Sequence, residues 1–247
     1  ANCSTNNFYI NYFIIPEKKE HKIKVYPDNN IILLAHLDRD YGFKDCSKYN
    51  NLLIPRNGAS IERDYGPFGY GSLRLDASKN QYVEIAPSNI FILNGDFTIE
   101  AFLYIPNTDY VNRPALAIQD RSASNNSYSG LLFGYSNNSG YEFWLTNNGT
   151  SWAISGASMG TFTLYSHTHY AVTRSSGTIR IFNNGSLIGI YSNSDAPYFD
   201  ASNYVPISIG RYYYPDRCFN GNIGELVITK NFAKWTDNFT PPSKRYE

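Results

Sequence analysis

The chain has 247 residues, with 21 Lys and Arg against 21 Asp and Glu, so its formal net charge is zero. A neutral chain lacks the general electrostatic attraction to nucleic acid and to anionic membranes, and we expect neither as a partner. No apolar run approaches the roughly 18 residues that span a bilayer, so membrane insertion is not expected. The 22 Tyr and 15 Phe residues against a single Met favour sheet surfaces over helical cores.

The first 30 residues differ from the rest of the chain. Residues 8–15, FYINYFII, are apolar and aromatic and precede the regular strand pattern. Such a run either adds to a sheet edge, in this molecule or in a neighbour, or packs as a strand on its own domain. We therefore divide the chain into an N-terminal arm or edge strand, residues 1–30, and one domain, residues 31–247. Because Ala1 is not followed by the features of a signal peptide, we expect that such a peptide was removed or that an initiator Met was trimmed.

Beyond the arm, strand signals recur at the spacing of a β-sandwich. In the longest run, residues 96–105, the two-residue period of a strand places Phe97, Ile99 and Ala101 on one face. Pro106 ends this run, because proline cannot donate to the ladder. The predicted strands are 31–37, 73–75, 82–85, 96–105, 115–119, 130–135, 142–146, 152–155, 169–174, 179–182, 187–190 and 219–230.

The sharpest local signal is the turn at residues 183–186, Asn-Asn-Gly-Ser. Asn184 and Gly185 favour a two-residue type I′ hairpin, in which both central residues need a positive φ. No segment shows sustained helical periodicity, and a single short helical turn is predicted at residues 231–236.

Four sequence blocks resemble laminin-G-like, concanavalin A-like domains. They are GDFTIE at residues 95–100, HYAVTR at 169–174, the strand and Asn-Gly turn at 178–185, and the closing block at 219–242. Their order is kept, and the resemblance covers roughly residues 31–245. It implies an all-β fold, a two-sheet antiparallel jelly-roll β-sandwich preceded by the extended arm.

Domains with this closing block look most like those of phage tail, fibre and capsid-associated proteins and of bacterial surface proteins. One position departs from the family pattern. The residue before Glu225 is often Asp in the family and is Gly224 here. An acidic contact at that position is therefore lost.

The three cysteines, Cys3, Cys46 and Cys218, show no metal-ligand spacing. In a jelly roll the first and last strands often lie side by side, so the resemblance allows a disulfide between Cys46 and Cys218. The alternative is three reduced thiols. Cys3 could also link to a neighbouring subunit.

Catalytic residues are not evident. Glycanases of this fold use two carboxylates about 5 Å apart, whereas Glu84, Glu100 and Glu225 are each isolated along the chain. We therefore expect no enzymatic activity. His167 and His169 share a strand face and could begin a metal site, but no third ligand is evident, and the resemblance favours a hydrogen-bonded structural His169 inside the sandwich.

Calcium is a frequent cofactor of the family that this chain resembles, so the resemblance makes a calcium site one option. Loop Asp side chains could hold it, but they also cap turns in most proteins. The loop residues are Asp38, Asp40, Asp109, Asp120, Asp195, Asp200 and Asp216.

The loop 211–217, RYYYPDR, is the main candidate binding surface. Adjacent strand residues alternate faces, so three consecutive tyrosines cannot all be buried in the core. Exposed Tyr beside Asp and Arg suits stacking and hydrogen bonding to a sugar, or anchoring of a protein partner. The alternative is that the tyrosines pack over the rim of their own sandwich. The candidate ligand-binding residues are Tyr213, Tyr214, Asp216, Arg217, Tyr110 and Arg113.

These features predict a non-enzymatic surface module, an adhesion or structural protein of a virion or cell surface that binds a glycan or a protein receptor. The alternative is a purely structural assembly subunit without a ligand, and a glycoside hydrolase of this fold is less favoured. We expect a homo-oligomer or a larger assembly, located outside the cell or on a virion surface.

Overall fold

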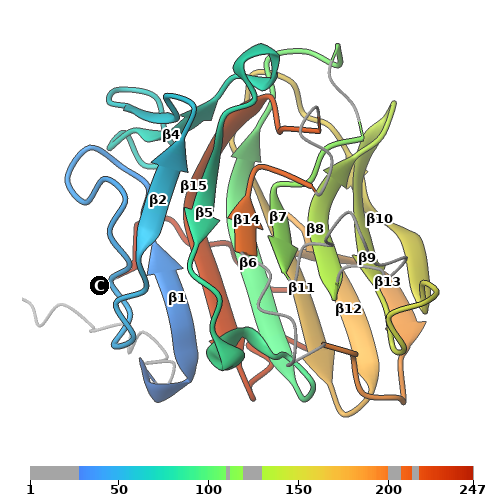
Figure 1. Cartoon of the computed structure of the whole chain (residues 1–247). Coiled ribbons are helices and arrows are strands. Elements are labelled where there is room, and N and C mark those ends of the chain that lie inside the picture. The colour runs from blue at the N-terminus through green and yellow to red at the C-terminus, as the bar shows by residue number, and fades with distance from the viewer. Residues whose placement is uncertain (1–27, 110–111, 119–129, 200–206, 213–216, 247) are drawn as a thin grey trace, which may run out of the picture.

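The computed structural model describes residues 28–109, 112–118, 130–199, 207–212 and 217–246 as two antiparallel β-sheets packed face to face (Figure 1). The larger sheet runs in the order β13 (Ser186–Ser192), β12 (Thr178–Asn183), β11 (Thr168–Ser175), β6 (Phe97–Tyr104), β15 (Gly221–Lys230), β4 (Ser72–Leu75) and β3 (Ser60–Glu62), with β1 (Ile31–Ala35) also paired to β15. The smaller sheet runs in the order β10 (Ile154–Thr161), β9 (Gly140–Leu145), β8 (Leu131–Ser136), β7 (Leu116–Ile118), β14 (Ile207–Ile209), β5 (Tyr82–Ile85) and β2 (Leu53–Arg56). The predicted two-sheet antiparallel sandwich is confirmed.

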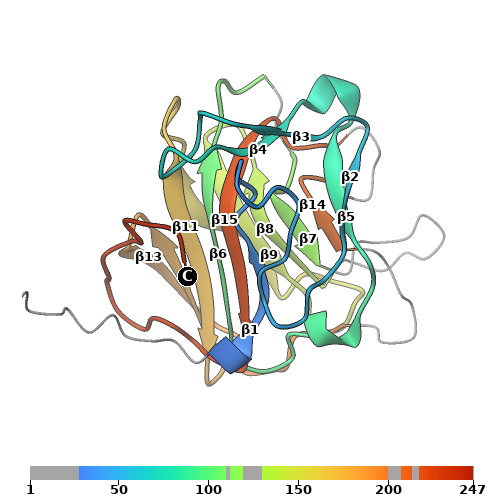
Figure 2. The ribbon, with the colours of Figure 1, turned by 90° about the vertical axis from the view of Figure 1, so that its left-hand side faces the viewer.

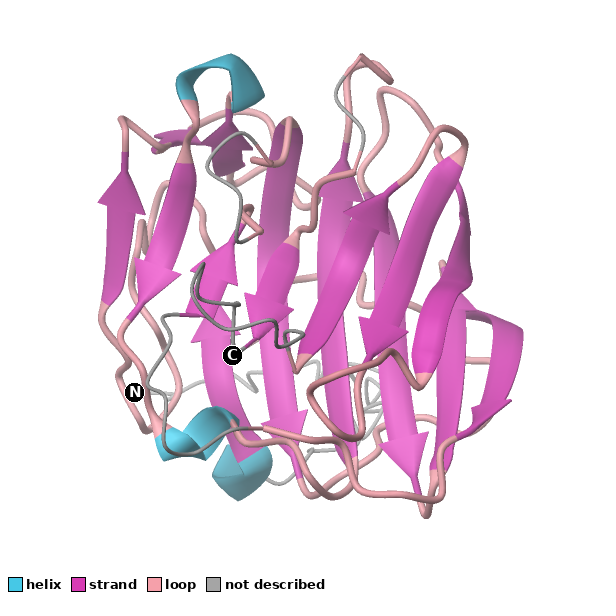
Figure 3. Ribbon diagram, turned by 45° about the vertical axis from the view of Figure 1, so that its right-hand side comes forward, coloured by secondary structure: helices cyan, strands magenta, loops and turns pink. Residues whose placement is uncertain are grey.

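Helix is scarce in the described ranges, as Figure 3 shows. The helical elements there are short 3-10 turns, η1 (Asp28–Asn30), η2 (Ala77–Lys79) and η3 (Asn89–Phe91). None of them has the length and apolar character to cross a bilayer.

The core lies between the two sheets, and β6 shows how the sequence pattern fills it. Phe97, Ile99 and Ala101 are fully buried in the main hydrophobic cluster, which confirms the shared face predicted for this strand. Each large apolar side chain buried in this way contributes roughly 1.5–3 kcal/mol to folding. The intervening Glu100 and Phe102 point away from the core, onto the outer face of the larger sheet.

The predicted hairpin turn is also confirmed. Asn183 pairs with Ser186, which leaves Asn184 and Gly185 as a two-residue loop with φ of 47° and 78°. A Cβ on Gly185 would lie 2.0 Å from the carbonyl oxygen of Phe239. Gly185 is therefore needed for two reasons: the turn requires a positive φ, and the C-terminal segment passes too close for a side chain.

The predicted helical turn at residues 231–236 is wrong. Residues 231–246, which we call the C-terminal strap, contain no helix and cross the outer face of the larger sheet (Figure 2). The rings of Trp235 and Phe239 stack at 3.7 Å between centroids, and both contact the ring of Phe182 on β12. Burying these rings on the sheet outweighs the weak local preference for a helix.

The proposed Cys46–Cys218 disulfide is not formed, and both residues are reduced thiols. The backbone N–H of Cys46 donates to Leu34, which pairs with Val227. β15 begins at Gly221, six residues before Val227, and a strand rises about 3.3 Å per residue, so the start of the strand lies up to about 20 Å from Val227. Cys218 lies beyond that start. A disulfide needs Cα atoms within about 7 Å. The first strand does lie beside the last, but at the wrong end of β15.

Several expectations concern residues outside the described ranges. These are the arm up to residue 27, with Cys3, and the binding residues Tyr110, Tyr213, Tyr214 and Asp216. Asp120 and Asp200, two of the loop residues considered for calcium, also lie outside these ranges. The division between arm and domain remains a prediction.

Candidate ligand-binding face

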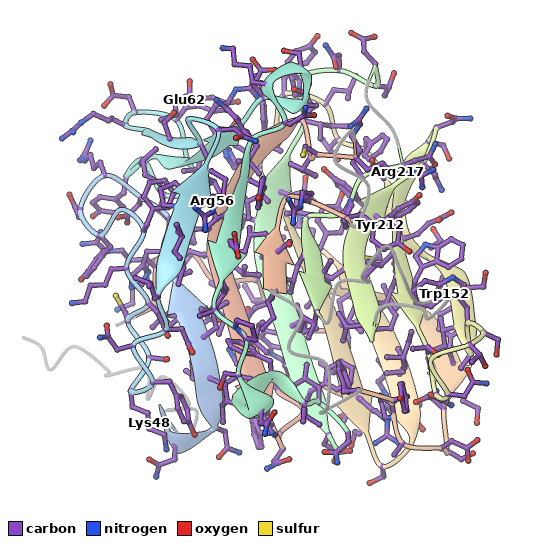
Figure 4. All side chains as sticks on the ribbon, in the orientation of Figure 1. Lys48, Arg56, Glu62, Trp152, Tyr212 and Arg217 are labelled. Atoms are coloured by element: carbon purple, nitrogen blue, oxygen red, sulfur yellow. The ribbon has the colours of Figure 1, made fainter. Side chains whose placement is uncertain are left out.

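A cluster of four aromatic side chains lies on the outer surface of the smaller sheet, and we call it the aromatic face: Tyr135, Trp144, Trp152 and Tyr212. They pack with Ala117 and Leu132 in a cluster separate from the main core. In Figure 4 the labelled Trp152 and Tyr212 lie over the same part of the sheet, near β8, β9 and β10.

Strand alternation places Trp144 on this face. On β9, Tyr141, Phe143 and Leu145 point into the core, so Glu142 and Trp144 point outward.

Tyr135 reaches the aromatic face because of a bulge. The register of β8 with β9 shifts between Leu132 and Tyr135, and Gly134 adopts a φ of 65°. A Cβ on Gly134 would lie 2.9 Å from a methyl carbon of Leu103 in the core. The bulge adds one residue to the inward side and so turns Tyr135 outward, beside Glu142.

The four rings form a row in which neighbours meet edge to face. Ring centroids are 6.3 Å apart for Tyr212 and Tyr135, 5.8 Å for Tyr135 and Trp144, and 5.4 Å for Trp144 and Trp152. The interplanar angles lie between 66° and 86°. Tyr212 is buried, whereas the other three are partly exposed and keep part of their ring surface in contact with solvent.

An acidic group and two basic groups border the row. Glu142 accepts hydrogen bonds from Trp144 Nε1 at 3.1 Å and from Asn137 Nδ2 at 2.6 Å. Arg217 Nη1 donates to the Tyr135 hydroxyl at 3.2 Å, and Arg113 Nη1 donates to the Cys218 carbonyl at 3.3 Å. Burial raises the pKa of Tyr135 despite the nearby Arg217, so the phenol is neutral and accepts this bond at physiological pH.

The structure brings together part of the predicted binding set. Arg217 and Arg113 lie at the aromatic face, and Tyr212, the first tyrosine of the predicted loop, is one of its four rings. Trp144, Trp152, Tyr135 and Glu142 were missed. The outward alternation of Glu142 and Trp144 along β9 was one available signal. Gly134 inside the predicted strand 130–135 was another, because a glycine within a strand often marks a bulge.

The isolated carboxylates do not form a glycanase pair in the described ranges. Glu100 is buried beneath the C-terminal strap, where it contacts His169, Lys234 and Tyr246. Glu84, on the smaller sheet, is paired with Arg56 at 2.8 Å. Neither Glu100 nor Glu84 therefore faces a second carboxylate with which it could act as a general acid.

His169 is a hydrogen-bonded structural residue, as expected, but it does not lie inside the sandwich. Its Nε2 contacts Glu100 Oε2 at 3.0 Å on the outer face of the larger sheet. Because Tyr170 and Val172 of β11 fill the core, the two-residue period turns His169 the other way. His167 lies on the same face among the rings of Tyr65 and Tyr104, and burial lowers its pKa to about 4.

The loop Asp residues within the described ranges do not form a cluster of metal ligands. No group of three or more His, Cys, Asp or Glu side chains in these ranges is arranged to hold a metal ion. Asp38 instead caps a turn, accepting from the backbone N–H groups of Asp40 and Tyr41, and it also pairs with Arg245. This is the ordinary turn chemistry of a loop Asp.

Comparison with known proteins places this architecture among lectin-like domains. A family model described as the concanavalin A-like lectin/glucanases superfamily matches residues 76–233. No curated protein matches the chain.

Solved structures share the fold at low identity. Domain 4 of AbnA, a GH43 extracellular arabinanase from Geobacillus stearothermophilus in complex with arabinotriose, superposes with a TM-score of 0.61 at 11% identity, over 81% of this chain and 92% of that one. The receptor-binding domain of botulinum neurotoxin mosaic serotype C/D gives 0.57 at 14% identity, over 86% and 49%. The binding domain of Paraclostridial Mosquitocidal Protein 1 gives 0.56 at 15%, over 82% and 49%. The chain therefore spans about half the length of these two toxin binding domains.

Proposed function

We propose that this chain, which belongs to the concanavalin A-like lectin/glucanases superfamily, is a non-catalytic binding module whose ligand is a glycan. The observation that carries the proposal is the aromatic face, in which partly exposed Trp and Tyr rings lie beside a carboxylate and a guanidinium. Such rings stack on the apolar faces of pyranoses, while the charged groups bond to hydroxyls.

Proteins of the same fold support a binding role. The AbnA domain was solved with arabinotriose, and the binding domain of botulinum neurotoxin DC was solved with SialylT and with rat synaptotagmin II. Cell entry of botulinum neurotoxin type C depends on interaction with two ganglioside molecules. These names cover glycan and protein partners. We favour a glycan because the aromatic face combines ring surfaces with a fixed hydrogen-bond acceptor.

We propose no catalytic role because of the way the carboxylates are arranged. A retaining glycosidase needs two carboxyl groups about 5 Å apart, and an inverting one needs roughly 6.5–9.5 Å with water between them. Glu142 at the aromatic face is bonded to Asn137 and Trp144, and Glu100 is sealed on the opposite sheet. The pattern fits recognition of a sugar rather than cleavage.

The direct test is a glycan array with the wild-type chain and with the Trp144→Ala/Trp152→Ala double variant. We expect the wild type to bind a set of glycans and the double variant to lose at least tenfold in affinity, since two stacking rings are removed. Tyr165→Ala is the matched control, because Tyr165 is 69% exposed and its carbonyl accepts from Tyr65, whose ring packs on Tyr104 of the larger sheet. Equal binding by the double variant and the wild type would contradict this assignment.

The site of action and the assembly are part of the proposal. We place the module outside the cell or on a virion surface, as a homo-oligomer or as part of a larger assembly, with the arm as the linking segment. Native mass of the chain with and without its first 25 residues tests this. A mass that collapses on truncation supports assembly through the arm, and a monomer in both forms contradicts it.

A further inference from the structure

We infer that the aromatic face selects neutral, hydroxyl-rich sugar units, with Glu142 as the acceptor that reads their hydroxyl groups. This inference rests on the proposed function and names its ligand class. It depends on how Glu142 is held, on the space beside its carboxylate, and on the charges around it.

Glu142 is fixed by its neighbours on two sides. Asn137 Nδ2 donates to Oε1 at 2.6 Å and Trp144 Nε1 donates to Oε2 at 3.1 Å. Asn137 is itself held, because its Oδ1 accepts from the backbone N–H groups of Ser139 and Gly140, each at 2.8 Å. A carboxylate has about four lone-pair positions and these bonds use two of them. The acceptor and the neighbouring indole ring are therefore locked together in one orientation.

Space beside the carboxylate is provided by Gly156 on the neighbouring strand β10. A Cβ built on Gly156 would lie 3.4 Å from the carboxyl carbon and from both oxygens of Glu142. Gly156 also has a φ of 64°, which side chains rarely adopt. A larger residue there would cover the carboxylate, and glycine leaves that side open.

The charges decide the class of sugar. The guanidinium groups of Arg217 and Arg113 are directed to the Tyr135 hydroxyl and the Cys218 carbonyl. Among the described residues, Glu142 is the charged group that is hydrogen-bonded to Trp144. It attracts hydroxyl donors and repels a carboxylate placed against it. A pair of adjacent sugar hydroxyls can donate to the remaining lone pairs while the ring stacks on an indole. An acidic sugar in the same place would bring two like charges together.

The test compares Glu142→Gln with Glu84→Gln on paired sets of oligosaccharides, one neutral and one bearing uronate or sialate units. Glu84 lies on β5 of the same sheet and pairs with Arg56, so Glu84→Gln is the matched control. We expect the wild type to bind neutral sugars at least tenfold more tightly than their acidic counterparts. Glu142→Gln should lose at least tenfold toward the neutral set, and Glu84→Gln should change by less than twofold.

The outcomes separate the two proposals. If the wild type binds no oligosaccharide of either set, the glycan function itself fails, and this inference fails with it. If the wild type binds sugars but prefers the acidic set, or if Glu142→Gln matches the wild type, the function stands and the role of Glu142 is overturned. Tryptophan emission of the folded variants, which reports the packing of Trp144, confirms that a loss of binding is not a loss of fold.

Discussion

His169 Nε2 lies 3.0 Å from Glu100 Oε2, in a pair buried on the outer face of the larger sheet. The same carboxylate accepts from the Tyr246 hydroxyl at 2.8 Å and from the ammonium of Lys234, which is also buried. Two of these donors come from the C-terminal strap. Glu100 is thus the point at which the strap is fixed to the sheet.

Glu100→Gln should destabilise the protein by about 3–5 kcal/mol. The substitution keeps the shape but leaves the Lys234 ammonium buried without a counter-charge, which is the costly way to break a buried pair. The free energy of unfolding in urea measures the effect. Glu84→Gln breaks the partly exposed pair with Arg56 and should cost less than about 1 kcal/mol. Equal losses in the two variants would contradict the anchoring role of Glu100.

The free energy of unfolding should fall at acid pH because Glu100 becomes protonated. Burial alone would raise the pKa of Glu100, but the Lys234 ammonium and the His169 hydrogen bond outweigh it and lower the pKa from 4.5 to about 2. Because the folded-state pKa is the lower one, the stabilisation is complete above pH 4.5 and is lost as the pH falls toward 2, by about 3 kcal/mol. Unfolding curves between pH 6 and pH 2 should show a steeper decline for the wild type than for Glu100→Gln. Parallel curves would show that Glu100 does not titrate in this window.

Gly224→Asp, which restores the acidic residue common in the family, should destabilise this chain by about 2–4 kcal/mol. A Cβ on Gly224 would lie 3.0 Å from Pro67 Cδ and 3.7 Å from Ser72 Cβ, so the carboxylate would have to displace packed neighbours and lose its hydration. Gly224→Ala keeps the steric change without the charge and should cost less. Thermal unfolding of both variants measures the difference, and a stabilised Asp variant would refute the prediction.

The two described cysteines should react with iodoacetamide at different stages. Cys46 is partly exposed, although burial raises the pKa of its thiol, so it should react slowly in the folded protein. Cys218 is fully buried and should react only after unfolding. Peptide mass spectrometry of labelled samples distinguishes the two sites. A peptide pair linked through residues 46 and 218 would contradict the assignment of both residues as free thiols.

The sequence predicted those parts of the fold that depend on a local residue pattern. The apolar alternation of β6 and the Asn-Gly turn before β13 each depend on neighbours in sequence, and both are confirmed. By contrast, β2, β3 and β14 were not predicted. They have only three or four residues each, and Pro55 lies within β2. Their strand conformation comes from pairing with distant partners, which no local signal shows.

The candidate site was harder to predict because its residues are far apart in the chain. Tyr135 and Tyr212 meet across 77 positions, and a bulge at Gly134 reverses the side on which simple alternation would place Tyr135. The anchor under the strap joins Glu100 to Lys234 across 134 positions. In the sequence, Glu100 and Lys234 both look like solvent-exposed charged residues. Only the folded chain shows that they form a buried ion pair.

The position of β15 makes completion of the larger sheet a late event. This strand pairs with β6 on one side and with β4 and β1 on the other, yet it lies at residues 221–230. A chain that stops before residue 221 leaves three strands with open hydrogen-bonding edges and the core without Ile223 and Ile228. Such edges pair readily with other chains. Nascent or truncated forms of this protein should therefore depend on chaperones until β15 is available, and frameshifts ahead of the codons for residues 221–230 should yield aggregates rather than shortened folded domains.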